Sequence, residues 1–165
     1  MRIITGSARG TRLKSPAGDG TRPTADRTRE ALFSMLGSRV VDARVLDLFA
    51  GTGALALEAL SRGAASAVLV DRTTHAILAE NAARTKLAGR AEIRRGDVYA
   101  AAAELAREGR TFDLIFADPP YAHGDNARVL EAAARGALLA AGGLLVLEQG
   151  AGEEIVPQVG ALRMM

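Results

Sequence analysis

The sequence predicts an α/β fold in which helices cover both faces of a mostly parallel sheet. From Ala43 onward, short apolar runs alternate with alanine-rich stretches of helical character, which is typical of a doubly wound sheet. Three glycines directly follow expected helices, where a left-handed cap favours glycine. A length of 165 residues suits one domain. We therefore expect a single domain made of a basic N-terminal arm and helix, 1–40, and a core, 41–165.

The N-terminal segment differs from the core in composition. Residues 1–20 contain four glycines among alternating side chains, which predicts a small β-hairpin or an extended arm. A helix is expected next, because Thr24 is a suitable N-cap and Asp26 favours the positive end of a helix. The predicted apolar face of this helix consists of Ala31, Leu32, Met35 and Leu36.

The core elements are predicted from apolar runs and from periodicity. Strands buried on both faces form nearly continuous apolar runs, whereas helices repeat apolar residues with a period of about 3.6. The expected strands span residues 45–49, 67–71, 91–95, 113–117 and 143–148. The expected helices span residues 54–63, 73–88, 99–109 and 126–140.

The composition argues against several classes of protein. The chain contains no cysteine and only two widely separated histidines, His75 and His123, so disulfides and thiolate metal sites are impossible and a histidine metal site is not expected. The apolar stretches are too short to cross a membrane, and no segment resembles a signal peptide. We expect a soluble, cytoplasmic, monomeric protein without a metal ion.

Positive charge is concentrated at the N-terminus. Residues 1–44 contain nine Lys or Arg against four Asp or Glu, a net charge of +5, whereas the remaining residues contain 12 against 15, a net charge of −3. A basic arm on an acidic body suits a phosphate backbone, because each neutralised phosphate releases counterions. The same arm is also consistent with a solvated tail that confers solubility.

Asp118-Pro119-Pro120-Tyr121 directly follows the apolar run 114–117, at the end of an expected buried strand. Open α/β sheets keep their active sites at such strand ends. An ionised Asp118 only accepts hydrogen bonds, and a residue before proline is held extended with its carbonyl available. Two such acceptors suit the two N–H bonds of an exocyclic amine, and the Tyr121 ring suits stacking on a nucleobase. A plain surface turn is the alternative interpretation.

The segment 47–53, Asp-Leu-Phe-Ala-Gly-Thr-Gly, connects the first core strand to the first core helix. Gly51 and Gly53 allow a sharp turn and a close approach of the backbone to a ligand. Asp71 ends the second expected strand, where a carboxylate can bind ribose hydroxyls, and Asp97 ends the third, in a position suited to an adenine amine. Each acid is also consistent with a helix N-cap, but three acids at successive strand ends favour a nucleotide site.

Two kinds of cofactor are compatible with this segment. A nicotinamide dinucleotide needs Gly-x-Gly-x-x-Gly at the helix N-terminus, and Ala56 at the third position is a tolerated variant. Arg72 would then suit a 2′-phosphate. Asp47 disfavours this interpretation, because its charge points toward the path of the pyrophosphate, whereas the ammonium of S-adenosylmethionine would be attracted. No hydride-transfer acid such as Tyr-x-x-x-Lys is recognisable, so S-adenosylmethionine is favoured.

Together, the two motifs resemble those of Rossmann-like S-adenosylmethionine-dependent methyltransferases that modify exocyclic amines of adenine or guanine. The N-terminal Arg9-Gly10 and Arg22-Pro23-Thr24-x-Asp26-Arg27-x-Arg29-Glu30-Ala31-Leu32-Phe33 are similar to RsmD-type methyltransferases of bacterial 16S ribosomal RNA. The resemblance covers about residues 1–150. It implies methylation of guanine N2 in small-subunit ribosomal RNA, either free or in a ribosomal assembly intermediate. It also implies a C-terminal antiparallel hairpin, but we expect only one strand after Gly152 and hence an incomplete hairpin.

The resemblance assigns roles to residues of this sequence. Asp118 and the Pro119 carbonyl would orient the guanine amine for in-line attack on the sulfonium methyl, and Tyr121 would stack on the extruded base. The implied catalytic residues are Asp118, Pro119, Pro120 and Tyr121. The implied cofactor-binding residues are Asp47, Phe49, Ala50, Gly51, Gly53, Asp71, Arg72, Asp97 and Val98. The residues expected at the RNA are Arg9, Arg12, Lys14, Arg22, Thr24, Arg27 and Arg29, although Arg29 could equally pair with a core carboxylate.

Two alternative functions are kept. An adenine-N6 methyltransferase shares the amine chemistry, but such enzymes usually add a domain that reads DNA sequence, for which 165 residues leave no space. A nucleotide-binding Rossmann oxidoreductase or a simple RNA-binding module is more distant. The Asp-Pro-Pro-Tyr motif does not distinguish adenine from guanine, so that distinction depends on the N-terminal segment alone.

Overall fold

Five parallel strands form a sheet in the order β3-β2-β1-β4-β5. The computed structural model describes residues 1–16, 23–119, 125–135, 137–147, 158–159 and 162–163. The strands of the sheet are β1 (Arg44–Leu48), β2 (Ser66–Asp71), β3 (Ala91–Arg95), β4 (Phe112–Ala117) and β5 (Leu139–Leu147). The helices are α1 (Pro23–Leu36), α2 (Ala54–Ser61), α3 (His75–Arg84), α4 (Val98–Arg107) and α5 (Asp125–Arg135), with 3₁₀ turns at Gly37–Val40 and Ala88–Arg90. The predicted doubly wound α/β fold is confirmed.

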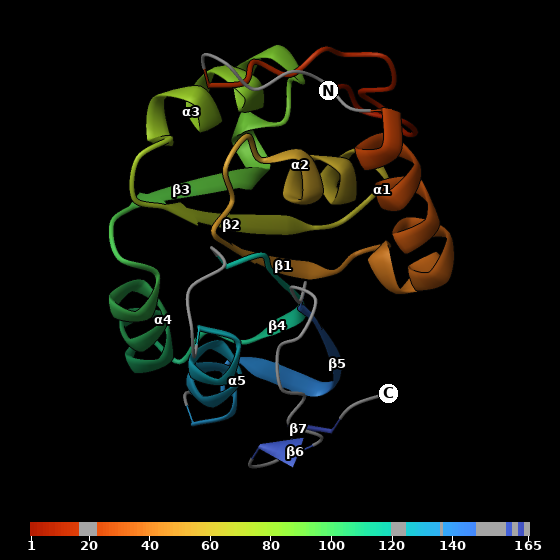
Figure 1. Ribbon diagram of the computed structural model, residues 1–165. Coiled ribbons are helices and arrows are strands. Elements are labelled where there is room, and N and C mark those ends of the chain that lie inside the picture. Colours follow the sequence, from red (N-terminus) through yellow and green to blue (C-terminus); the bar gives the residue numbers. More distant parts are fainter. Residues whose placement is uncertain (17–22, 120–124, 136, 148–157, 160–161, 164–165) are drawn as a thin grey trace.

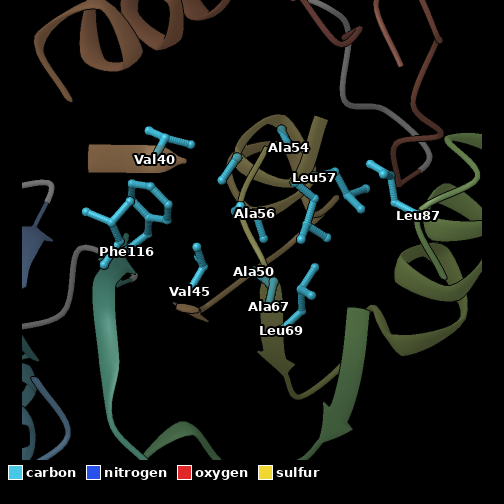
Figure 2. Packing of buried hydrophobic residues seen from close by; sticks show 14 of the residues in the cluster. Val40, Val45, Ala50, Ala54, Ala56, Leu57, Ala67, Leu69, Leu87 and Phe116 are labelled. Atoms are coloured by element: carbon cyan, nitrogen blue, oxygen red, sulfur yellow. The ribbon is translucent and has the colours of Figure 1, made fainter. Parts of the chain in front are cut away.

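The helices cover the sheet in two layers. Helices α1, α2 and α3 lie on one face, and α4 and α5 lie on the other (Figure 1). Each layer buries its own apolar cluster against the sheet. Figure 2 shows Leu57 of α2, Val45 of β1 and Phe116 of β4 in the first of these clusters. Among the helices of the described ranges, none combines the length and the apolar character that crossing a membrane would require.

The boundary between α5 and β5 differs from the prediction. The sequence predicts a helix to residue 140, but α5 ends at Arg135 and β5 begins at Leu139. Alanines favour a helix here, yet the backbone pairs with β4, where Phe112 N donates to Leu138 O at 2.7 Å. The register then shifts before Leu114 pairs with Leu144. Pairing with the neighbouring strand therefore overrides local helix propensity.

Helix α1 buries only part of the predicted apolar face, namely Leu36 and, partly, Leu32. It begins at Pro23, so Thr24 lies in its first turn and not at the N-cap. Met35 is 84% exposed and Ala31 is also exposed, whereas Phe33 is buried. The Phe33 ring packs on Phe116 of β4, with centroids 5.9 Å apart. The buried face also includes a charged residue, Arg29, which an apolar pattern could not reveal.

The C-terminal strands form a separate small sheet. β6 (Gln158–Val159) and β7 (Leu162–Arg163) pair antiparallel. The prediction of a single final strand was therefore wrong. Two-residue strands are too short to show the alternating pattern by which strands are recognised.

The N-terminal arm, residues 1–14, folds back on itself and docks on the core. Arg2 and Arg12 form an antiparallel bridge, and Ile3 exchanges hydrogen bonds with Thr11 and Gly10 at 3.0 and 2.8 Å. The Ile3 and Leu13 side chains are buried in the same cluster as α2 and α3, beside which the arm lies (Figure 1). The predicted hairpin is present, but it is packed against the body and is not a solvated tail.

Glu58 of α2 is fully buried and holds the arm in place. Its Oε1 accepts a hydrogen bond from Ile4 N at 2.9 Å, and its Oε2 accepts one from Thr5 N at 3.1 Å. Arg62 Nε donates to Oε2 at 2.9 Å, and Arg29 Nε lies 3.4 Å from Oε1. A buried carboxylate is tolerated when it is both hydrogen-bonded and paired with cations, and Glu58 has both kinds of partner.

Replacement of Glu58 tests this anchor. Glu58→Ala should lower the free energy of unfolding by about 3–5 kcal/mol, because the buried Arg29 would keep only Asp26 as a carboxylate partner and the N–H groups of Ile4 and Thr5 would lose their acceptor. Glu80→Ala is the matched control: it removes a carboxylate from exposed ion pairs with Lys14 and Arg84 and should cost less than about 1 kcal/mol. Urea denaturation of both variants measures the two values, and equal losses would show that Glu58 is not an anchor.

Candidate active site at the carboxyl ends of the strands

Parallel pairing gathers the ends of β1, β2 and β4 at one edge of the sheet. Leu48 of β1 is in register with Ala117 of β4 and with Val70 of β2. The predicted site residues Asp118 and Asp71 directly follow these partners. Asp118 is exposed at this edge and Pro119 is buried. Ligands of open α/β sheets bind at this kind of edge.

The turn between β1 and α2 uses left-handed backbone at three positions. The φ angle is 63° at Phe49, 60° at Gly51 and 83° at Gly53. Glycine adopts such angles readily, whereas Phe49 is strained. A Cβ on Gly51 would meet no atom within 4 Å, but one on Gly53 would lie 3.0 Å from Leu78 Cδ2. Gly51 therefore permits the close approach of a ligand, while at Gly53 both the positive φ angle and crowding by Leu78 disfavour a side chain.

Asp71 ties this turn to the end of β2. Its Oδ2 accepts from Gly51 N at 2.9 Å, and its Oδ1 accepts from Thr73 N at 2.9 Å and from Thr74 N at 3.2 Å. Partial burial raises the pKa of Asp71, but these backbone hydrogen bonds outweigh it and hold the pKa below the usual value. Asp71 is therefore ionised, and carboxylate oxygens can accept further hydrogen bonds from a ligand.

Asp47 is buried behind the same turn, with 3% of its surface exposed. Its Oδ2 accepts a hydrogen bond from Ala56 N at 3.3 Å. Burial raises the pKa of Asp47 to about 8 despite this hydrogen bond, and the charges of Asp71 and Asp118 raise it further. The carboxyl of the free protein is thus mostly protonated at pH 7. A bound cation would favour its ionised form.

The Asp47 carboxyl lies at the first turn of α2 and accepts a hydrogen bond from it. In dinucleotide-binding folds the amides of this turn receive a pyrophosphate, but here Ala56 N already donates to Asp47. The ionised Asp71 beside Gly51 would also repel an anion. The turn therefore suits a ligand with a cationic group and does not suit a pyrophosphate.

Asp97 is the N-cap of α4. Its Oδ2 accepts from Ala100 N at 2.9 Å, so the capping role that the sequence left open is present. Asp97 itself is exposed, and the following Val98 is buried. A capping carboxylate retains acceptor capacity for a ligand. Contact of Asp97 and Val98 with an adenine stays a prediction.

A cluster of two rings and a guanidinium lies next to the turn. The Phe49 and Tyr99 rings meet edge to face with centroids 6.3 Å apart, and Arg128 Cζ lies 3.7 Å from the Tyr99 centroid. Such cation–π contacts are attractive, so the cluster connects the β1–α2 turn to α4 and α5. The only sequence signal for Tyr99 was its place just after Asp97 and Val98. Nothing in the sequence marked Arg128.

The other predicted cofactor residues flank these groups. Ala50 is buried and its N–H donates to Val70 O at 2.9 Å, whereas Arg72 is exposed. Two predicted catalytic residues, Pro120 and Tyr121, lie outside the described residues, so stacking by Tyr121 stays a prediction. In the part of the chain that is described, no group of three or more His, Cys, Asp or Glu side chains is arranged to hold a metal ion.

The predicted RNA-binding residues separate into exposed and buried ones. Those exposed on the arm and on α1 are Arg9, Arg12, Lys14 and Arg27. Arg29 is 5% exposed and pairs with Glu58 and Asp26. Of its two predicted roles, the structure has the core ion pair, and RNA contact by Arg29 is not supported. Arg22 and the Thr24 side chain lie outside the described part of the chain.

Between the arm and α1 lies a pocket of about 380 Å³. Arg2, Arg9 and Arg27 line it together with Asp26 and Glu30. Arg9 and Arg27, which are 18 positions apart in the sequence, thus border one cavity. Arg2 was missed, because a single arginine near a chain start carries no pattern.

A family model described as conserved hypothetical protein 95 matches residues 1–165. The chain belongs to that family. It is the RsmD family, and the resemblance of the motifs is confirmed. The Bacillus subtilis member named "Putative rRNA methyltransferase YlbH" is 38% identical over 99% of this chain and 90% of that protein. Ribosomal RNA small subunit methyltransferase D of Escherichia coli K12 is 46% identical over 75% of this chain but only 62% of that protein.

Solved structures that are similar to this chain have the same fold. The structure titled "Putative methyltransferase yhhF from Escherichia coli" is 40% identical, with a TM-score of 0.80 over 95% of this chain and 86% of that one. The fold is therefore shared over nearly the whole of this chain.

The protonation of Asp47 leads to a prediction about stability and pH. The pKa of Asp47 is about 8 in the folded protein and has an ordinary value of 3.8. The folded state therefore keeps a proton that the unfolded chain loses, and stability falls as pH rises from about 4 to about 8. Asn cannot ionise, so Asp47→Asn should stabilise the ligand-free protein more at pH 8 than at pH 5.

Guanidinium denaturation at the two pH values measures this difference. The control is Asp113→Asn, because ion pairing with Arg44 lowers the pKa of Asp113 and keeps it ionised at both pH values. Asp113→Asn should change the free energy of unfolding by the same amount at pH 5 and at pH 8. If Asp47→Asn also changed the free energy of unfolding by the same amount at both pH values, Asp47 would already be ionised in the free protein.

Proposed function

We propose that this chain is an S-adenosylmethionine-dependent methyltransferase that acts on ribosomal RNA, and that its target is N2 of a guanine in the small subunit. The observation that carries the proposal is the carboxylate arrangement at one sheet edge. Asp47 of β1 accepts a hydrogen bond from the first turn of α2, and Asp71 and Asp118 lie beside it. Membership of the RsmD family supports methylation of small-subunit ribosomal RNA, because the Escherichia coli member is named ribosomal RNA small subunit methyltransferase D.

The cofactor follows from the charges of the site. S-adenosylmethionine supplies an electrophilic methyl group on a sulfonium, and it also carries an ammonium. Asp47 would lose its proton and hold the ammonium, while Gly51 lets the backbone approach closely. Asp71 would accept hydrogen bonds from the ribose hydroxyls, and Asp97 with Val98 would contact the adenine. These roles are consistent with the exclusion of a pyrophosphate from the same turn.

Asp118 and Pro119 would act on the substrate amine. An exocyclic amine of guanine is conjugated with the ring and is a poor nucleophile. Hydrogen bonds from its N–H groups to the Asp118 carboxylate and the Pro119 carbonyl would orient the nitrogen and stabilise the positive charge that develops on it. The exposed position of Asp118 at the end of β4 allows a substrate to reach it. Tyr121 would stack on the extruded base.

The RNA would contact the arm and α1. Arg9 and Arg27 border one pocket with Arg2, and Arg12 and Lys14 are exposed on the same arm. Phosphates attract such a cluster. With this substrate, the chain would act in the cytoplasm as one domain, with residues 1–40 as its basic arm and helix and residues 41–165 as its catalytic core. Naked RNA and an assembly intermediate are both suitable substrates for this surface.

The catalytic assignment is tested by Asp118→Ala. The variant should transfer labelled methyl to small-subunit RNA at least about 100-fold more slowly, because a group aimed at developing charge is lost. S-adenosylhomocysteine should bind with unchanged affinity in isothermal titration calorimetry. Asp113→Ala, at the opposite end of β4 and paired with Arg44, is the control and should keep its activity. Normal methylation by Asp118→Ala would refute the assignment.

The RNA surface is tested by the salt dependence of binding. Arg9→Glu combined with Arg27→Glu should weaken RNA binding and make the plot of log affinity against log salt shallower by about one or two units, because up to two phosphate contacts are lost. Arg107→Glu combined with Arg110→Glu makes the same change in net charge at α4 and just beyond its end. If both pairs lower the slope equally, the effect is general charge and not a contact surface.

A further inference from the structure

Asn81 of α3 joins the arm to the β1–α2 turn. Its side chain is fully buried. Oδ1 accepts a hydrogen bond from Lys14 N at 2.7 Å, and Nδ2 donates to Lys14 O and to Thr52 O, both at 2.9 Å. One amide group therefore holds two segments that are 38 residues apart in the sequence. Thr52 lies between Gly51 and Gly53, in the turn assigned to the cofactor.

A second contact connects the same two segments. Thr52 Oγ1 lies 3.6 Å from Met1 Sδ, within hydrogen-bonding distance for sulfur. Helix α3 also contacts the arm at its surface, where Glu80 pairs with Lys14 at 3.1 Å and Arg84 Nη1 donates to Arg12 O at 3.5 Å. The return half of the arm thus lies along α3, and the buried Asn81 is its link to the turn.

We propose that Asn81 is a positioning residue that couples cofactor binding at the turn to the ordering of the RNA-binding arm. The inference rests on the proposed function, which assigns the cofactor to the turn and the RNA to the arm. A ligand seated against Gly51 restricts the turn, and the Thr52 carbonyl then restrains Asn81. Asn81 in turn restrains both backbone groups of Lys14.

The coupling must act in both directions. If the cofactor stabilises the docked arm, RNA held by the docked arm must raise the affinity for the cofactor by the same factor. No change of shape is needed, because a ligand that reduces the motion of one segment lowers the ordering cost of the other. The enzyme would thereby favour RNA binding in the form that already holds its methyl donor.

Ser61 offers a matched comparison, because it anchors the arm without touching the turn. Its Oγ accepts from Ala8 N at 2.9 Å and donates to Thr5 O at 2.7 Å. Ser61→Ala loosens the arm at the other end of α2. Asn81→Ala loosens the arm and also cuts its link to Thr52. Only the second change should remove the coupling.

Amide hydrogen exchange of the arm, measured without and with saturating S-adenosylhomocysteine, tests the proposal. In the wild-type protein the ligand should slow exchange at Leu13 and Lys14 by about fivefold or more, the lower end of usual coupling factors. In Ser61→Ala the arm amides should exchange faster overall, but the ratio of the exchange rates of the free and bound forms should be the same as in the wild type. Asn81→Ala should still bind the ligand, but the exchange rates of its free and bound forms should differ by less than about twofold.

Three results would overturn the inference. The first is a wild-type arm whose exchange is unchanged although calorimetry shows that S-adenosylhomocysteine binds; this needs no variant and leaves the proposed function intact. The second is an undiminished ratio in Asn81→Ala, which would make Asn81 merely structural. The third is a wild-type protein that does not bind S-adenosylhomocysteine, which would contradict the proposed function itself.

Discussion

The parallel pairing of β1 with both β2 and β4 is the constraint on which the site depends. This register places Asp71 and Asp118 on either side of the turn that follows Leu48. Asp47, one residue earlier, is enclosed by the sheet and α2, and its pKa rises because burial and two neighbouring carboxylates oppose its charge. A compact cationic ligand would compensate the negative charges of these carboxylates. The backbone register therefore determines which kind of ligand this edge of the sheet suits.

The N-terminal segment combines structural and exposed charges. Glu58 and Asn81 are both fully buried, and each holds backbone groups of the arm. Arg29 pairs with Glu58 inside the protein, while Arg27, two residues earlier, is exposed at the pocket. The two arginines of α1 therefore have different roles. The buried Arg29 fixes the helix and the arm, and the exposed Arg27 carries positive charge at a defined surface.

Much of the core was predictable, because buried parallel strands are continuous apolar runs and acids at their ends are conspicuous. Three features were not. The buried face of α1 contains Arg29, whose partner Glu58 is 29 positions away in the sequence. The alanines before Gly142 favour a helix locally, but pairing with β4 makes them a strand. Asn81 lies inside a helix with no motif around it, and its role exists only because the fold brings Lys14 and Thr52 together.

The proposed function requires that this sheet edge transfers a methyl group to a guanine amine of ribosomal RNA. The most direct test is a mass-spectrometric map of methylated nucleosides in small-subunit RNA and in small-subunit particles, each treated with the protein and S-adenosylmethionine. We expect new N2-methylguanosine at a single position in at least one of these substrates. New N6-methyladenosine, or no new methylated nucleoside in either substrate, would refute the proposed function.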